Sequence, residues 1–173
     1  MNTDLEIVTR PPPDAIDAYI LCDVAGTAYA VDSREVEQLE MVGALTPVPN
    51  SPPFVEGVTS SRGKVIPVVN LRSRFGFPRI APDPRARIIV TRTEGRTIGL
   101  LVDSAREFTR IPAEAVQRAP DALDASAPYL RGVAHLGERL VLVLDVRTLL
   151  GTTAVPVLPT STVPSSGVLP AAV

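Results

Sequence analysis

The chain has 173 residues, of which 45% are hydrophobic and 21% charged, and its net charge is −2 at pH 7. This balance is typical of a soluble globular protein and gives no electrostatic reason to expect nucleic acid or an anionic membrane surface as a partner. The single cysteine, Cys22, excludes an internal disulfide and a multi-cysteine metal site. No apolar run approaches the roughly 20 residues that cross a bilayer, and the chain does not begin like a secretory signal. We therefore expect a cytoplasmic protein without membrane insertion.

Both ends of the chain are expected to be disordered. Consecutive prolines at 11–13 separate residues 1–15 from the fold, because proline has no backbone N–H to donate. Residues 152–173 contain four prolines and no charged side chain, a Pro/Ser/Thr-rich composition typical of a tail that does not fold. The folded part is predicted to span residues 16–151.

The first half of the folded part predicts two β-hairpins and short helices. The segments YILCDV and TAYAVD flank a turn at Ala25-Gly26, and the segments GVTSS and KVIPVVN flank a turn at Arg62-Gly63. A short helix follows Asn70, whose side chain can cap the first amides, and ends at Gly76. Pro53, and likewise Pro128 in the second half, suits the first turn of another short helix.

The second half repeats this plan. The block PYLRGV at 128–133 repeats PFVEGV at 53–58, 75 residues downstream, and EGRTIGLLVDS resembles AGTAYAVDS. RIIVTR and TIGLLVD predict a hairpin that turns at Glu94-Gly95, and GVAHL and RLVLVLD predict another. Asp145 and Gly151 repeat the signals for the helix that follows. One supersecondary unit is therefore used twice.

A duplicated β-rich unit of about 65–70 residues favours two small barrels over one sandwich. A domain of this size has a marginal core when it stands alone, so we expect the two units to share apolar surface. A groove along their junction is then the natural place for a partner to bind.

Little in the sequence indicates catalysis. Between Gly57 and Gly63 there is one residue too many for a phosphate-binding loop, and Val65 stands after Lys64 where that loop needs Ser or Thr. His135 is the only histidine, and a surface or packing role is the simpler interpretation of it. We expect no enzymatic activity, no metal and no cofactor. Two carboxylates can meet in space from anywhere in a chain, so a hydrolase with paired carboxylates stays a remote alternative.

Four blocks, in this order and spacing, resemble the CheW-type chemotaxis coupling proteins. They are YILCDVAGTAYAVDSREVEQL, PVPNSPPFVEGVTSSRGKVIPVVNLRSRFG, IIVTRTEGRTIGLLVDSAREF and YLRGVAHLGERLVLVLDVRTLL. The resemblance implies an all-β fold of two intertwined SH3-like five-stranded β-barrels with short helices. It implies a subdomain 1 at about 25–84 and a subdomain 2 at about 85–145, with N- and C-terminal elements exchanged between them.

The function that the resemblance implies is a non-enzymatic scaffold. Such proteins join the cytoplasmic tips of chemoreceptors (methyl-accepting chemotaxis proteins) to the regulatory domain of a chemotaxis histidine kinase. They are recruited to receptor arrays, where further CheW-like proteins can join them in rings. The alternative left open is a CheW-like module of a non-flagellar pathway that controls gliding, twitching or development.

The resemblance also implies contact residues and structural glycines. The receptor-binding positions are Val36, Leu39, Arg62, Leu101 and Val102. The kinase-binding positions are Met41, Val42, Leu45, Arg118 and Asp121. The structural turn glycines are Gly57, Gly63 and Gly132. The chain departs from the family at Ser60-Ser61, where Asn-Leu is common, and near Ala122, where an aromatic residue is usual in a ring-contact segment.

Overall fold

The computed structural model describes residues 17–121 and 127–151, so the termini that we expect to be disordered lie outside the described residues. The strands are β1 (Ala18–Val24), β2 (Thr27–Asp32), β3 (Val36–Met41), β4 (Val55–Ser61), β5 (Lys64–Asn70), β6 (Arg87–Thr93), β7 (Arg96–Val102), β8 (Ser104–Arg110), β9 (Val116–Arg118), β10 (Leu130–Leu136) and β11 (Arg139–Leu144). The short helices are the 3-10 helices η1 (Ser33–Glu35) and η2 (Ala113–Ala115) and the α-helices α1 (Leu71–Arg74) and α3 (Val146–Gly151).

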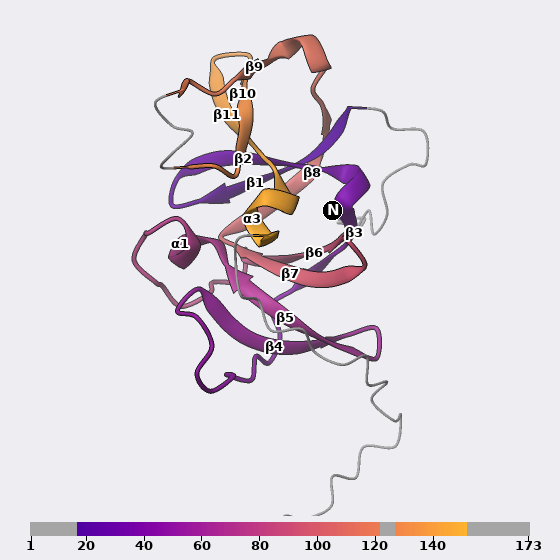
Figure 1. Ribbon diagram of the computed structural model, residues 1–173, viewed down its shortest axis with the longest axis vertical. Coiled ribbons are helices and arrows are strands. Elements are labelled where there is room, and N and C mark those ends of the chain that lie inside the picture. Colours follow the sequence, from indigo (N-terminus) through magenta and orange to yellow (C-terminus); the bar gives the residue numbers. More distant parts are fainter. Residues whose placement is uncertain (1–16, 122–126, 152–173) are drawn as a thin grey trace, which may run out of the picture.

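The strands form two sheets, and each sheet takes strands from both halves of the chain (Figure 1). Sheet A has the order β8-β1-β2-β11-β10-β9, and sheet B has the order β3-β6-β7-β5-β4. This confirms the prediction of an all-β fold with two intertwined small barrels. Sheet A has six strands instead of the expected five, because the short β9 adds to its edge. A division of the chain near residue 84 does not separate the barrels, since each barrel contains a hairpin from the other half.

The sequence repeat is also a structural repeat. In sheet A, Val143 of β11 pairs in parallel with Ala30 of β2. In sheet B, Val68 of β5, which stands 75 positions before Val143, pairs in parallel with Gly99 of β7. These two parallel pairings are equivalent, so each half of the chain contributes its first hairpin to the barrel of the other half.

Gly57 and Gly132 occupy equivalent close approaches inside strands, each beside a β-bulge. A Cβ on Gly57 would lie 2.4 Å from the carbonyl oxygen of Thr46, and a Cβ on Gly132 would lie 2.4 Å from that of Gln117. Glycine is therefore required by space at both positions. The expectation of turn glycines needs correction here, because only Gly63 lies in a turn, with φ +76°.

The barrel built on sheet A, which we call barrel A, and the barrel built on sheet B, which we call barrel B, close differently. In barrel B, Thr46 follows β3 and pairs with Val58 of β4 through two backbone hydrogen bonds of 2.9 and 2.8 Å. In barrel A, β8 leads through η2 into β9, which pairs with β10 at three successive positions, 116–118. The backbone ladder that closes barrel B is therefore the shorter one.

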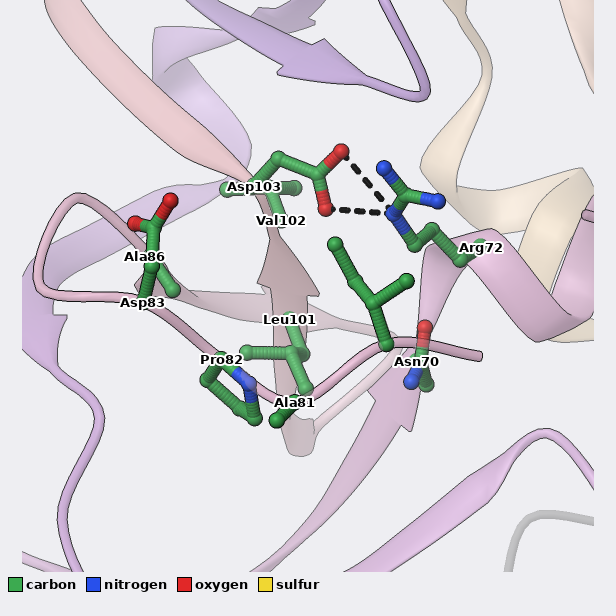
Figure 2. Close-up of a pocket in the computed structure, with 10 residues that line it drawn as sticks. Asn70, Arg72, Ala81, Pro82, Asp83, Ala86, Leu101, Val102 and Asp103 are labelled. Carbon is green, nitrogen blue, oxygen red and sulfur yellow. Dashed lines mark hydrogen bonds and ion pairs between the residues drawn. The ribbon is translucent and has the colours of Figure 1, made fainter. Parts of the chain in front are cut away.

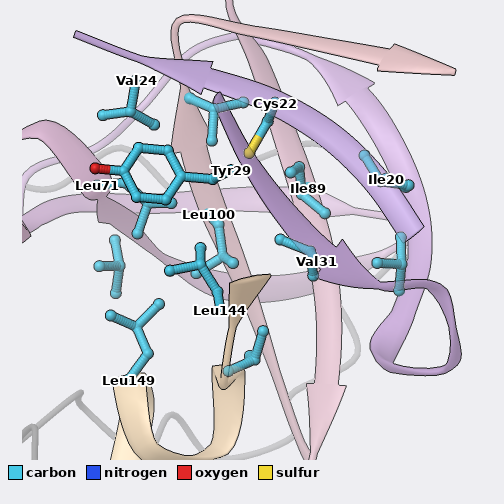
Figure 3. Packing of buried hydrophobic residues seen from close by; sticks show 14 of the residues in the cluster. Ile20, Cys22, Val24, Tyr29, Val31, Leu71, Ile89, Leu100, Leu144 and Leu149 are labelled. Atoms are coloured by element: carbon cyan, nitrogen blue, oxygen red, sulfur yellow. The ribbon is translucent and has the colours of Figure 1, made fainter. Parts of the chain in front are cut away.

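The buried side chains form three clusters, and the largest lies between the barrels (Figure 3). Ile88 and Val90 of β6 fill the interior of barrel B, whereas Ile89 points to the opposite face, as the alternation of a strand requires. We call the cluster between the barrels the seam core. It comprises Ile20, Cys22, Val24, Tyr29, Val31, Val36, Val69, Leu71, Ile89, Ile98, Leu100, Val102, Leu144, Val146, Leu149 and Leu150. The barrels thus share apolar surface, as their size predicts.

The two helices that follow β5 and β11 have the caps that the sequence predicts. The side chain of Asn70 accepts a hydrogen bond from the Ser73 amide at 3.3 Å, and that of Asp145 accepts one from the Thr148 amide at 3.0 Å. Each cap satisfies an amide that has no partner within the first helical turn. Both helices place their buried residues in the seam core.

The short helices expected at Pro53 and Pro128 are turns instead. The amide of Val55 donates to the carbonyl of Pro52 at 2.9 Å, and β4 begins at Val55 itself. The chain enters a strand before a helical turn can continue. Propensity at the proline is therefore overridden by the pairing of the strand that follows it.

Candidate interaction site

Four of the five predicted receptor-binding residues lie in or beside buried clusters. Val36 and Val102 belong to the seam core and are 5% and 2% exposed. Leu101 is 6% exposed and faces the interior of barrel B, and Leu39 is half-buried against the seam core. Val36 and Val102 thus help to fill the space between the barrels, whereas Leu101 and Val102 also line the shallow depression described below.

Arg62, the fifth predicted receptor-binding residue, is exposed at the tip of the β4–β5 hairpin. Arg62 has φ +48° and Gly63 has φ +76°, the pair of left-handed residues that suits a tight two-residue hairpin turn. Within residues 17–121 and 127–151, no hydrogen bond or ion pair engages the Arg62 side chain. Lys64 is also exposed, so the hairpin tip presents two positive charges to solvent.

A buried polar cluster, which we call the Ser61 network, joins this hairpin to β3. It consists of Gln38, Glu40 and Ser61, and both Gln38 and Ser61 are 6% exposed. The Ser61 hydroxyl donates to Glu40 Oε1 at 2.6 Å and accepts from Gln38 Nε2 at 2.8 Å, and Gln38 Nε2 also donates to Glu40 Oε1. This cluster cannot be predicted from the sequence, because Ser61 and Gln38 are 23 residues apart and meet only when barrel B closes.

Three of the predicted kinase-binding residues lie at the end of β3 and directly after it. Met41 is 68% exposed, more than any other large hydrophobic side chain in the described residues. Val42 and Leu45 are half-buried and pack against the core of barrel B. The exposed Met41 side chain therefore stands beside two residues that hold the segment onto the barrel.

The other two predicted kinase-binding residues belong to a different part of the fold. Arg118 ends β9 of sheet A and is exposed, and Asp121 follows it and is also exposed. Ala122, where the family commonly has an aromatic residue, lies outside the described residues. The five predicted kinase-binding residues are thus divided between the two sheets.

A shallow depression lies where the chain crosses from barrel B to barrel A (Figure 2). At its edge, the Asp103 carboxylate accepts from Arg72 Nε at 2.8 and 2.9 Å and from the Ala25 amide at 2.8 Å. Asp103 stands between β7 of sheet B and β8 of sheet A, while Ala25 belongs to the β1–β2 turn. These contacts tie the two barrels together and occupy the carboxylate.

Burial and hydrogen bonds shift the pKa of several titratable groups in the described residues. Hydrogen bonds from Arg85 lower the pKa of Asp83, which lines the depression. Burial raises the pKa of Glu35 in η1 and that of the Cys22 thiol, while His135 is exposed on β10. No group of His, Cys, Asp and Glu side chains suited to a metal ion occurs in the part of the chain that the structure describes.

A stack of aromatic and arginine side chains covers part of the seam core. Phe75 lies between Tyr29 and Tyr129, with ring centroids 5.0 and 4.9 Å apart. The Arg74 guanidinium lies over the rings of Tyr129 and Phe54, at 5.3 and 5.5 Å from their centroids. Phe54, Phe75 and Tyr129 are half-buried, and aromatic and arginine side chains of this kind are common at protein interfaces.

Among the described residues, no helix is both long and apolar enough to pass through a bilayer. The features that reach solvent include a charged hairpin, an exposed methionine and a group of half-buried aromatic side chains, all held on two interlocked barrels. These features define a small all-β module for binding other proteins.

Residues 18–154 match the CheW-like domain, and the chain belongs to this family. It is 29% identical over 133 residues to the "Chemotaxis protein CheW" of Klebsiella aerogenes, which covers 76% of this chain and 80% of the relative. It is 32% identical over 135 residues to "Protein FrzA" of Myxococcus xanthus, which covers 78% and 83%. Its structure is similar to the scaffolding protein TtCheW of Thermoanaerobacter tengcongensis, with a TM-score of 0.73, 25% identity and coverage of 78% of this chain and 92% of that one.

These similarities define a CheW-like scaffold or adaptor of chemotaxis. A scaffold holds other proteins together and does not transform a substrate, which agrees with the expectation of a protein without enzymatic activity.

Proposed function

We propose that this protein couples chemoreceptors to a chemotaxis histidine kinase by binding both at once. Its partners would be the cytoplasmic tip of a methyl-accepting chemotaxis protein and the regulatory domain of the kinase. The observation that carries this proposal is that the family match runs through both barrels, from β1 to the end of α3. The protein would work in the cytoplasm, recruited to receptor arrays.

Coupling of this kind needs several weak contacts and not one strong contact. A single micromolar interface is worth about −8 kcal/mol. An array raises the effective concentration of each partner, so several such interfaces together hold the assembly. Signalling also requires that the two states of the kinase contact the adaptor differently. A partner that binds both states with equal affinity does not change the equilibrium between them.

On the receptor side, we assign the direct contact to Arg62. Val36 and Val102 are buried in the seam core and Leu101 in barrel B, so these residues would shape the surface from below. Leu39 is half-buried and would lie at its border. A Val36→Asp variant does not test receptor binding, because the new charge would be buried and would destabilise the fold.

On the kinase side, we assign the central contact to Met41. An exposed, unbranched apolar side chain adapts to the shape of a partner surface, and Val42 and Leu45 hold its segment in place. Arg118 and Asp121 would form a second contact from sheet A. Lateral contacts with other CheW-like proteins in rings would use the same region of β9.

The test is a reconstituted assay with receptor-containing membranes, the kinase and full-length adaptor. Arg62→Ala should leave the urea unfolding midpoint unchanged and lower kinase activation. Arg85→Ala removes another exposed arginine, whose partner Asp83 is also exposed, and should activate the kinase like the wild type. Equal activation by both variants would remove Arg62 from the contact. A wild-type protein that binds neither receptor nor kinase would overturn the proposed function.

A second candidate is the same adaptor role in a pathway that controls gliding, twitching or development. The Ser61 network favours a different set of partners, because Ser61 stands where the family commonly has Leu, directly before Arg62. Co-purification of the full-length protein from its own cells, with a flagellar receptor and its kinase as the bound proteins, would argue against this candidate.

A further inference from the structure

Strand β3 connects the two proposed contact regions of barrel B. It begins at Val36 on the proposed receptor side and ends at Met41 on the proposed kinase side. β3 is the edge strand of sheet B, and its backbone pairs with β6 on one side. What holds the other side of β3 therefore determines whether the strand can move relative to its neighbours.

The Ser61 network holds that other side. Gln38 and Glu40 project from β3 and meet the hydroxyl of Ser61, the last residue of β4. Ser61 pairs with Lys64 at the base of the hairpin, and Arg62 is the next residue along the chain. Two hydrogen bonds thus link β3 to the hairpin that carries the proposed receptor contact, and a third joins Gln38 to Glu40 within β3.

The second barrel provides an internal comparison. Leu136 stands 75 positions after Ser61, at the base of the equivalent β10–β11 hairpin, and packs against the core of barrel A. There an apolar contact and the β9–β10 ladder close the barrel. In barrel B a hydrogen-bonded cluster and the Thr46–Val58 bridge do so. Hydrogen bonds depend steeply on direction, so they fix the hairpin relative to β3 more strictly than an apolar contact does.

We propose that the Ser61 network makes the Arg62 hairpin and β3 move as one unit, so that a partner bound at the hairpin changes the contact that β3 offers to a second partner. The physical link between hairpin and strand follows from the geometry, and its use in signalling rests on the proposed function. Gln38, Glu40 and Ser61 act as positioning residues in this proposal, since they act on partners only through Arg62 and Met41.

Amide hydrogen exchange of the full-length protein tests the physical link without any partner. Ser61→Ala removes the shared hydroxyl and should speed exchange both in the hairpin, residues 62–64, and in β3, residues 38–41. Ser60→Ala changes the exposed neighbour on the same strand and should match the wild type. Ser61→Thr keeps a hydroxyl and should restore slow exchange. Unchanged exchange of residues 38–41 in folded Ser61→Ala would overturn the link.

If Ser61→Ala does not fold, Gln38→Ala removes the opposite member of the network and should give the same pattern of faster exchange in both segments. Faster exchange confined to β3, with a hairpin that behaves like the wild type, would show that the two move independently and would overturn the proposal.

The second measurement is the affinity of the kinase regulatory domain with and without a receptor cytoplasmic fragment. Coupling between two binding sites typically changes affinity by about 5–150-fold. In Ser61→Ala the affinity for each partner measured alone should stay near the wild-type value. The change in kinase affinity that the receptor fragment causes should largely disappear. An undiminished receptor effect would overturn the role in signalling. Failure of the wild type to bind either partner would count against the proposed function alone, and the exchange result would still decide the link.

Discussion

Replacing Gly132 with alanine tests the close approach that closes barrel A. The added Cβ would lie 2.4 Å from the carbonyl oxygen of Gln117 and 2.8 Å from a methyl carbon of Val116. Both residues belong to β9, and Gly132 itself pairs with Arg118 of that strand. Because the nearer atom is backbone, a change of rotamer cannot relieve the clash. β9 has to move away, and its pairing with β10 weakens.

The expected cost combines two effects. Extra atoms in a well-packed site cost about 1–3 kcal/mol, and each weakened hydrogen bond costs about 0.5–1.5 kcal/mol. We therefore expect Gly132→Ala to lower the free energy of unfolding by about 2–4 kcal/mol. Gly43→Ala is the matched control, because Gly43 has no heavy atom within 4 Å of an added Cβ and its φ is not in the left-handed region. It should stay within about 1 kcal/mol of the wild type.

The assay is urea unfolding followed by far-ultraviolet circular dichroism. Gly132→Ala should lower the midpoint with an unchanged dependence on urea concentration, since the surface exposed on unfolding stays about the same. Equal free energies of unfolding for Gly132→Ala and Gly43→Ala would refute the steric reasoning, because the two substitutions differ mainly in the space around the new methyl group.

Further predictions concern the seam core and a buried carboxylate. Leu100 is fully buried between the barrels, so Leu100→Ala should cost about 2–5 kcal/mol. Unfolding should remain one transition by both circular dichroism and tyrosine fluorescence, and two separate transitions would show that the seam does not join the barrels. Burial alone would raise the pKa of Asp32, but hydrogen bonds and charge from Arg34 outweigh it and lower the pKa. The stability that Asp32 contributes is therefore fully present above its ordinary pKa of about 3.9. It is lost as the pH falls through the lowered pKa of Asp32 in the folded protein. Asp32→Asn should destabilise the protein at neutral pH and flatten this acid dependence, and an unchanged urea midpoint at every pH would contradict it.

Local features of the fold could be predicted from the sequence because short-range chemistry determines them. The turns at Ala25-Gly26 and Glu94-Gly95 have a left-handed residue at both central positions, and glycine takes the second of them at little cost. Asn70 and Asp145 cap helices because their side chains reach amides only three residues away. The prolines before β4 and β10 show the limit of such reasoning, since strand pairing overrides the local preference for a helix.

The candidate site could be predicted only in part. The exposure of Arg62 follows from its place in a tight turn, and the alternation of β3 indicates that Gln38 and Glu40 share a face. Alternation does not show whether that face meets solvent or another strand. Val36 illustrates this: its apolar character is clear from the sequence, but its burial follows from a second sheet that lies against it.

By itself, then, the sequence determined the duplicated unit, its hairpins, its caps and the family to which the chain belongs. The tertiary structure alone decided which hairpin joins which sheet, that the seam between the barrels is filled, and that Ser61 meets Gln38 and Glu40 across barrel B. The physical reason is the sequence separation between the residues that interact. Turns and caps depend on residues a few positions apart. Burial and the Ser61 network depend on segments that come together only when both halves of the chain have exchanged their hairpins.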